Sequence, residues 1–118
     1  MLIIKYCQEG EIISDFMAET WVKNIIQGYK QEKMDKVIKI SNEIPLDLFC
    51  LFTMQGLLDY SEIKIYYCDK LCEINPYMGL CFVNEEEAIE SHYAYYSNEM
   101  LKIGYNNIKK NKEKLNET

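Results

Sequence analysis

The sequence contains no arginine, and all thirteen of its basic residues are lysines. Arginine is the residue best suited to bidentate recognition of phosphate and guanine. Together with a formal net charge of -6, its absence argues against direct binding of nucleic acid. The five glycines are isolated from one another, so the chain has no glycine-rich phosphate-binding loop. The sequence therefore predicts neither a nucleic-acid-binding protein nor a nucleotide-hydrolysing enzyme.

Long apolar runs are also missing. The opening "MLIIKYC" is too short for a secretory signal, and no stretch approaches the length of a membrane span. The five cysteines are an odd number, which fits reduced thiols better than a framework of disulfides. We therefore expect a cytoplasmic protein with no membrane contact.

The chain has a single histidine, which limits the catalytic and metal chemistry open to it. His92 is the only imidazole base that could activate a cysteine, and nothing in the sequence brings it to one. Cys68, Cys72, Cys81 and His92 could supply four zinc ligands, but the C-x-x-x-C spacing is a poor match to known zinc sites. A metal-stabilised module is thus a third hypothesis. Our prediction is a non-enzymatic protein with no catalytic residue, no metal and no cofactor.

What is present is enough for one folded domain. Hydrophobic residues make up 48% of the 118 residues, so the chain can bury a core. We expect a single α+β domain over residues 1–110 and a flexible lysine-rich tail over 111–118.

Hydrophobic periodicity and turn residues define the expected elements. Strands are predicted at 1–7, 35–41, 62–68 and 71–74, and helices at 16–29, 43–58 and 84–110. "LCFV", residues 80–83, is either a brief strand or the lead into the last helix. The fold class is α+β, a small mixed sheet of three to four strands with three helices, in the order β-α-β-α-β-β-α with a long C-terminal helix.

Local patterns add detail to the first two helices. Ser14 or Asp15 is expected to cap the first helix, and Asn42 the second. The first helix has a wide apolar face, made by Phe16, Trp21, Val22, Ile25, Ile26 and Tyr29. The second is apolar nearly all round, which is typical of a central helix.

The least ordinary stretch is "VNEEEAIESHYAYY", residues 83–96. Asn84 followed by Glu87 fits a helix N-cap with its partner three residues on, which places Glu85 to Glu87 in the first turn. A stripe at spacings of four and three residues then predicts packing along one helix face, through Ile89, Tyr93, Tyr96, Met100 and Ile103.

Charge is unevenly distributed along the chain. Residues 41–100 contain eleven acidic residues and two lysines, a net charge of -9, whereas residues 101–118 contain five lysines and two glutamates, a net charge of +3. A surface of one sign steers partners of the other sign, so a basic partner surface is implied. The alternative is that the acidity only keeps a small protein soluble.

Two segments, "GEIISDFMAETW" and "ISNEIPLDLFCLFTMQGLLDYSEI", resemble parts of small prokaryotic and prophage proteins. By its size, acidity and lack of catalytic motifs, the chain is similar to phage-encoded inhibitors of host defence such as anti-CRISPR proteins. That group shares no fold or motif, so the resemblance assigns no role to any residue. It implies an inhibitor that acts by binding.

The leading hypothesis is therefore a protein-binding inhibitor or accessory factor, which docks an acidic face on a basic, nucleic-acid-binding partner. The predicted partner-binding residues are Glu85, Glu86, Glu87, Glu90, Tyr95 and Glu99. The alternative is a protein that binds a small nucleotide-type ligand in a tyrosine-lined pocket. In either case a homodimer through the C-terminal helix is one expected assembly.

Overall fold

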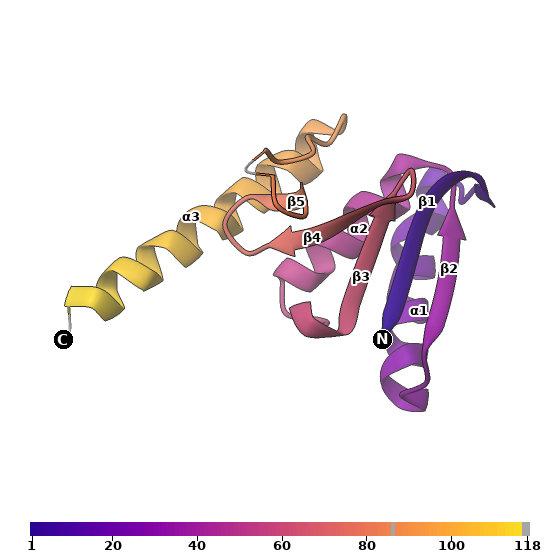
Figure 1. Ribbon diagram of the computed structural model, residues 1–118, viewed down its shortest axis with the longest axis horizontal. Coiled ribbons are helices and arrows are strands. Elements are labelled where there is room, and N and C mark those ends of the chain that lie inside the picture. Colours follow the sequence, from indigo (N-terminus) through magenta and orange to yellow (C-terminus); the bar gives the residue numbers. More distant parts are fainter. Residues whose placement is uncertain (86, 117–118) are drawn as a thin grey trace.

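The computed structural model describes residues 1–85 and 87–116 and has α+β architecture, as the sequence predicts (Figure 1). The order is β-α-β-α-β-β-β-α, so the sheet has five strands where three to four were expected. The additional strand is "GLCF", which covers three of the four residues of "LCFV", the segment predicted to be either a brief strand or the lead into the last helix. The elements are β1 Leu2–Glu11, α1 Asp15–Glu32, β2 Lys36–Ile40, α2 Glu43–Met54, η1 Tyr60–Glu62, β3 Ile63–Tyr67, β4 Lys70–Asn75, β5 Gly79–Phe82 and α3 Ala94–Asn116.

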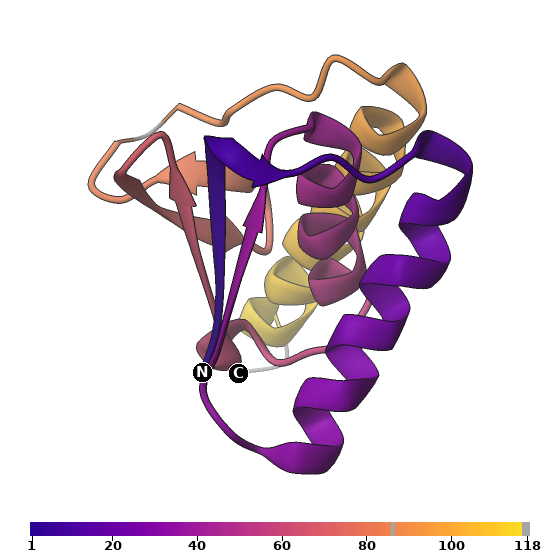
Figure 2. The same ribbon diagram turned by 90° about the vertical axis from the view of Figure 1, so that its right-hand side faces the viewer.

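The strands form one mixed sheet in the order β2-β1-β3-β4-β5. β1 pairs in parallel with both β2 and β3, and β4 and β5 then add as antiparallel strands. All three helices lie on the same side of this sheet, which leaves the other face uncovered (Figure 2). The protein is therefore built of two layers, with its core between the sheet and the helices.

The two parallel crossovers have opposite hands. Across the sheet, the chain moves from β1 to β2 in one direction and then from β2 past β1 to β3 in the opposite direction. The connecting helices α1 and α2 nevertheless cover the same face of the sheet (Figure 2). Two right-handed crossovers, the usual arrangement, would have put the two helices on opposite faces. The uncovered face is a direct consequence of this exception.

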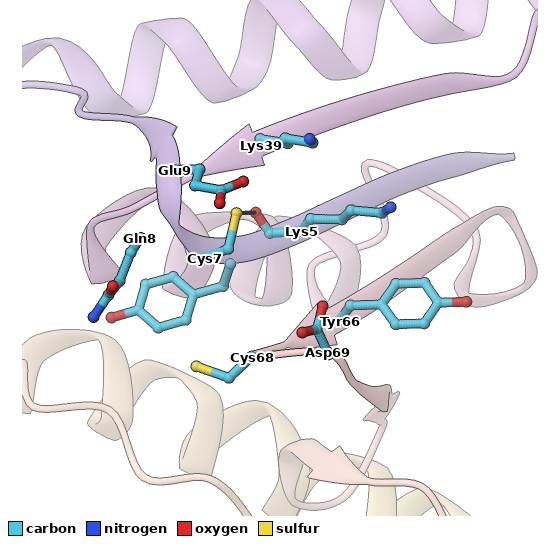
Figure 3. A pocket seen from close by; sticks show the side chains of 9 residues that line it. Lys5, Cys7, Gln8, Glu9, Lys39, Tyr66, Cys68 and Asp69 are labelled. Carbon is cyan, nitrogen blue, oxygen red and sulfur yellow. Dashed lines mark hydrogen bonds between the residues drawn. The ribbon is translucent and has the colours of Figure 1, made fainter.

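Strand residues alternate between the two faces. Leu2 and Ile4 point to the helices and are buried, as are Ile63 and Ile65 on β3. The intervening residues lie on the uncovered face, where Lys5 stands in register with Lys39 on one side and Tyr66 on the other (Figure 3). One face is thus apolar and the other carries lysines.

The prediction of the apolar face of α1 is wrong for one residue, Phe16. Ala18, Val22, Ile26 and Tyr29 are buried, but Phe16 is 88% exposed. Phe16 lies two residues before Ala18, and at about 100° per residue this places it on the side of the helix opposite the buried face. It is therefore an aromatic side chain on the surface rather than part of the core.

The prediction that the second helix is central is confirmed, because every residue of α2 from Ile44 to Met54 is buried. The expected cap at Asn42 is not made by its side chain. That amide instead accepts from the backbone N–H of Ile13 at 3.1 Å and donates to the carbonyl of Ile13 at 2.6 Å. Asn42 thus joins the segment before α1 to the start of α2. Ser14 is the N-cap residue of α1, also without a side-chain capping bond.

The prediction that the last helix starts after Asn84 is wrong, because α3 starts at Ala94. Asn84 has a φ of 68°, a left-handed conformation that asparagine tolerates and that ends β5 in a turn. The following segment is held by the edge of β5, where the N–H of Ile89 donates to the carbonyl of Leu80 at 2.7 Å and Ala88 bridges Cys81. Pairing with this edge satisfies backbone groups that a helix would otherwise have satisfied.

α3 is long and packs on the core through its N-terminal half. Tyr96, Met100 and Ile103 contact the core, as their spacing predicts, whereas Tyr93 lies before the helix. The helix continues through residues 111–116, where a tail was expected. Within the described residues, no helix combines the length and apolarity required to cross a membrane.

Two helical glycines provide a matched test of this packing. A Cβ on Gly104 in α3 would lie 2.2 Å from the carbonyl oxygen of Tyr77, whereas one on Gly28 in α1 would meet only the Lys36 amine at 3.7 Å. We expect Gly104→Ala to lower the free energy of unfolding by about 1–3 kcal/mol, since the helix must shift. Gly28→Ala should raise it by about 0.5–1 kcal/mol, because alanine restricts the unfolded chain. Urea unfolding measures both, and a neutral Gly104→Ala would contradict the docking of α3.

Candidate functional site

The starts of all three helices lie at one end of the molecule (Figure 2). α1 and α2 begin where β1 and β2 end, and α3 begins close by after the segment 84–93 has crossed this end. In open sheets with parallel strands, the carboxyl ends of the strands are the usual place for binding. This end is therefore the candidate functional site.

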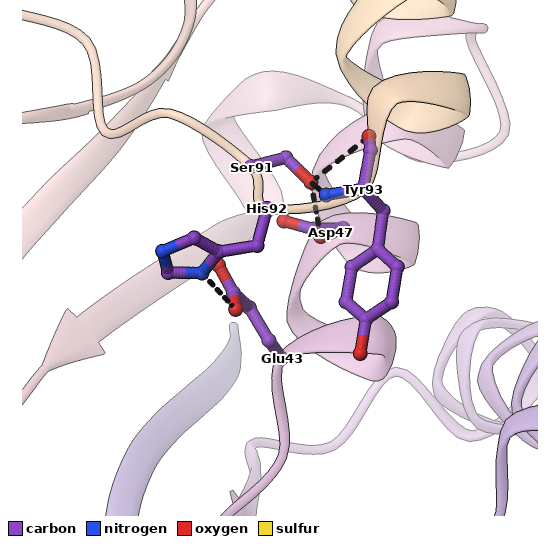
Figure 4. A network of polar contacts seen from close by, with 5 residues as sticks. All are labelled: Glu43, Asp47, Ser91, His92 and Tyr93. Carbon is purple, nitrogen blue, oxygen red and sulfur yellow. Dashed lines mark hydrogen bonds and ion pairs between the residues drawn. The ribbon is translucent and has the colours of Figure 1, made fainter.

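Asp47 is the most unusual side chain there, because it is a carboxylate on the fully buried helix α2. Only 6% of Asp47 is exposed, and its Oδ2 accepts a hydrogen bond of 2.6 Å from the hydroxyl of Ser91 (Figure 4). Burial raises the pKa of Asp47 to about 6, although the bond from Ser91 opposes the shift. Asp47 thus fastens the segment 84–93 to the core at some electrostatic cost.

His92 makes a second connection between the same two elements. Its Nδ1 lies 2.5 Å from Oε2 of Glu43, in the first turn of α2 (Figure 4). The hydrogen bond and the charge of Glu43 raise the pKa of His92. The ring remains 81% exposed. Protonation of His92 therefore strengthens the contact, and the stability that it adds is lost as the pH rises through the folded-state pKa.

These four side chains do not form a catalytic triad. In a triad the histidine lies between the hydroxyl and the carboxylate and bonds to both. Here Ser91 donates to Asp47, while His92 turns to Glu43. The hydroxyl of Ser91 also accepts from the N–H of Tyr93 at 3.1 Å, which organises the turn into α3. The arrangement consists of two separate clamps between α2 and the segment 84–93.

Exposed apolar side chains lie beside the clamped region. Ile12 and Phe16 are 78% and 88% exposed, and Met17 is exposed as well. Phe16 and Glu19 are three residues apart on α1 and so lie on neighbouring positions of its surface. Glu19 in turn lines a shallow groove together with Tyr95 and Tyr96 of α3.

The two tyrosines of the groove contact each other, with ring centroids 5.6 Å apart. Tyr95 is 69% exposed, while Tyr96 packs against the core. The pKa of Tyr96 is raised, mainly by burial and then by the negative charge of Glu19. The groove therefore links α1 to α3. We call this region, together with the exposed Glu90 beside the clamp residue Ser91, the docking end, defined by Ile12, Asp15, Phe16, Glu19, Glu90 and Tyr95.

The partner-binding residues predicted from the sequence have different positions. Glu85, Glu87 and Glu90 are exposed on the segment 84–93 rather than in the first turn of a helix. Glu86 lies outside the described residues. Tyr95 is exposed on the first turn of α3, and Glu99 makes an ion pair of 3.3 Å with Lys102. Of these residues, Glu90 and Tyr95 belong to the docking end.

The four potential zinc ligands do not come together. Cys68 is exposed in the turn after β3, Cys72 and Cys81 are buried, and His92 faces Glu43. In the part of the chain that the structure describes, no group of three or more histidine, cysteine or acidic residues could hold a metal ion. Burial also raises the pKa of Cys72 to about 11 and that of the Cys50 thiol further still, so both remain protonated at neutral pH.

Comparison with known proteins finds no matching family model, no matching curated protein and no matching solved structure.

Two important residues were missed by the sequence analysis. Phe16 was counted with the core, although it does not share the spacing of three and four residues that links Ala18, Val22, Ile26 and Tyr29. Asp47 received no role, although it is the only charged residue between Ile44 and Met54. A charged residue within a helix that is otherwise apolar all round is the signal that could have identified it.

Asp47→Asn tests the cost of the buried carboxylate. The folded-state pKa of about 6 lies above the usual aspartate value, so the folded protein binds the proton more tightly and the wild type loses stability as the pH rises from about 4 to above 6. Asparagine keeps an oxygen for Ser91 but carries no charge. After allowance for solvent screening, we expect Asp47→Asn to raise the free energy of unfolding by about 1 kcal/mol at about pH 8 and to change it little at about pH 4.

Urea unfolding at the two pH values measures this difference. Glu87→Gln, which neutralises an exposed carboxylate on the segment 84–93, is the control and should change the free energy by less than about 0.5 kcal/mol at either pH. Destabilisation by Asp47→Asn at about pH 8 but not at about pH 4 would show that the charge itself is needed, and equal destabilisation at both pH values would show that the carboxyl group is needed whatever its charge; either result would contradict the prediction.

Proposed function

We propose that this protein is a non-enzymatic inhibitor or accessory factor that binds a basic protein surface through its docking end. The observation that carries the proposal is Phe16, an aromatic side chain that is 88% exposed and lies between the acidic residues Asp15 and Glu19. Aromatic side chains of this kind are the usual anchors of protein interfaces, where a few residues supply most of the binding energy. Ile12, Met17 and Tyr95 add apolar surface near this anchor.

The acidic residues around the anchor define the chemistry of the partner. Asp15 and Glu19 flank Phe16 in the sequence of α1, where Glu19 also pairs with Lys23 at 3.0 Å, and Glu85, Glu87 and Glu90 are exposed on the segment 84–93. A polar, charged rim round an apolar centre is the common anatomy of a non-obligate interface. A basic partner surface complements this rim, and its encounter with the docking end would be accelerated by long-range attraction.

A basic surface is often a nucleic-acid-binding surface, because contacts with phosphates dominate such affinity. A protein docked there would block the nucleic acid sterically and electrostatically. The general likeness in size and acidity to phage-encoded inhibitors of host defence supports this mechanism. We therefore propose, as the specific form of the function, that the partner is a nucleic-acid-binding protein of a host.

The clamps described above support rapid and specific docking. Asn42 fixes the segment before α1, and Ser91 and His92 fix the segment 84–93 against α2. A surface that is already ordered loses less conformational entropy on binding than a mobile loop does. Rigid presentation is therefore consistent with an inhibitor that must compete with nucleic acid.

Affinity capture at low and high salt, with four variants, tests the proposal. The wild type should retain a basic protein in stoichiometric amounts, and high salt should release it because exposed charges are screened. Phe16→Ala should weaken that binding at least about tenfold. Reversal of charge in Glu19→Lys with Glu90→Lys should weaken it as well and should reduce the dependence on salt.

The matched controls lie far from the docking end. Met34→Ala removes an exposed apolar side chain beyond the other end of α1, and Glu113→Lys reverses an exposed charge near the end of α3. Both should bind as the wild type does. The proposal is wrong if all variants capture the same protein equally, or if the captured protein still binds nucleic acid in the presence of the wild-type chain.

A homodimer through α3 stays a prediction. Leu101, Tyr105 and Ile108 are exposed at spacings of four and three residues on the helix surface that does not pack on the core. Sedimentation of the purified protein over a range of concentrations measures the assembly directly.

A further inference from the structure

A hollow in the uncovered face of the sheet has chemistry that the docking end lacks. It lies across β2, β1 and β3 and has a volume of about 460 Å³. Pockets for small molecules usually measure a few hundred Å³ or more, so this hollow can admit part or all of a small ligand. The close view shows that three side chains, Lys39, Lys5 and Tyr66, extend from it side by side in the same direction (Figure 3).

Two of these side chains are ammonium groups on neighbouring strands. Lys5 of β1 and Lys39 of β2 are register partners, so they stand directly opposite each other on the same face. Like charges in this position destabilise a sheet. Among the residues that the structure describes, no carboxylate lies within ion-pair distance of either amine. An external anion between the two amines would remove their repulsion.

Tyr66 provides an aromatic wall next to this pair of cations. It is the register partner of Lys5 on the other side, and the Lys5 amine lies 6.0 Å from the centroid of its ring. A planar heterocycle can stack on such a ring with little dependence on its identity. Lys39, Lys5 and Tyr66 therefore form a row across three strands, in which the two amines can bind a phosphate and the ring can stack on a base.

Two carboxylates at the edge of the hollow limit the charge that it can accept. Glu9 and Asp69 line it together with the two lysines, so its formal charge is balanced. We expect a single phosphate to be tolerated better than a polyphosphate chain or a nucleic-acid strand, because each added negative charge would be repelled by Glu9 and Asp69. Unfavourable contacts of this kind are a common source of specificity.

We propose that this hollow binds a nucleoside monophosphate, with the phosphate between Lys5 and Lys39 and the base on Tyr66. The site is on the sheet face opposite the helices and goes beyond the proposed docking function. Occupancy would place an anion between the amines of Lys5 and Lys39. Binding would therefore be weakened by salt and by the loss of either lysine.

Titration of the folded protein with AMP, followed by amide chemical shifts, tests the proposal. Saturable shifts are expected on β1, β2 and β3 around the hollow. Lys5→Gln and Lys39→Gln should each raise the dissociation constant for AMP at least about tenfold, because each removes a charge-assisted contact. Lys64→Gln is the control, since Lys64 lies on the same uncovered face in the adjacent row and does not line the hollow.

Further ligands separate the contributions of the phosphate and the base. Tyr66→Leu should weaken the binding of AMP and leave the binding of inorganic phosphate unchanged. ATP should bind to the wild type more weakly than AMP does. Lys39 is exposed on an edge strand, so Lys39→Gln is expected to fold even if Lys5→Gln does not. The proposal fails if AMP gives no saturable shifts, if the shifts lie elsewhere, if Lys64→Gln weakens AMP as much as the other variants, or if inorganic phosphate binds as tightly as AMP.

Discussion

The complete burial of α2 is the constraint on which the other features of this protein depend. An apolar helix exposed to water would be costly, and here the sheet, α1 and α3 enclose it, with Trp21 meeting Phe49 edge to face at 6.3 Å. Its buried polar groups must then find partners. Thr53 finds one within the helix, donating to the carbonyl of Phe49 at 2.7 Å, but Asp47 has to accept from outside it. The position of the segment 84–93, and so of Glu90 in the docking end, is a consequence of where that partner, Ser91, must lie.

The placement of α1 and α2 on the same face buries that face of the sheet and exposes the other face to water. The helices that cover one face leave the other without a layer, so its side chains must be compatible with water. Lys5, Lys39 and Lys64 meet that requirement on β1, β2 and β3. Two carboxylates, Glu9 and Asp69, lie beside Lys5 and Lys39 on this face. The exception in crossover handedness thus leaves a charged, water-compatible sheet face opposite the helices.

The sequence predicted those elements whose signals are local, and failed where a distant segment competes. The apolar character of α2 required burial wherever the helix lay, and the spacing of Tyr96, Met100 and Ile103 required a packed face on α3. Asn84 and Glu87 carried a sound capping pattern, but the edge of β5 offered the backbone of Ile89 a partner that no local pattern records. The meeting of Asp47 with Ser91, 44 residues apart, and the handedness of the crossovers are likewise properties of the assembled fold.

The acidic residues at the helix starts have two roles that cannot be separated. Asp15 and Glu43 lie in the first turns of α1 and α2, where a negative charge interacts favourably with the helix dipole, so they support the fold as well as any docking. Their presence alone is therefore weak support for an interface. Phe16 is different, because a side chain that is 88% exposed buries almost nothing within its own chain. Its large apolar surface lowers solubility without adding stability, and the proposed partner would account for its presence by covering it together with the exposed Ile12 and Met17.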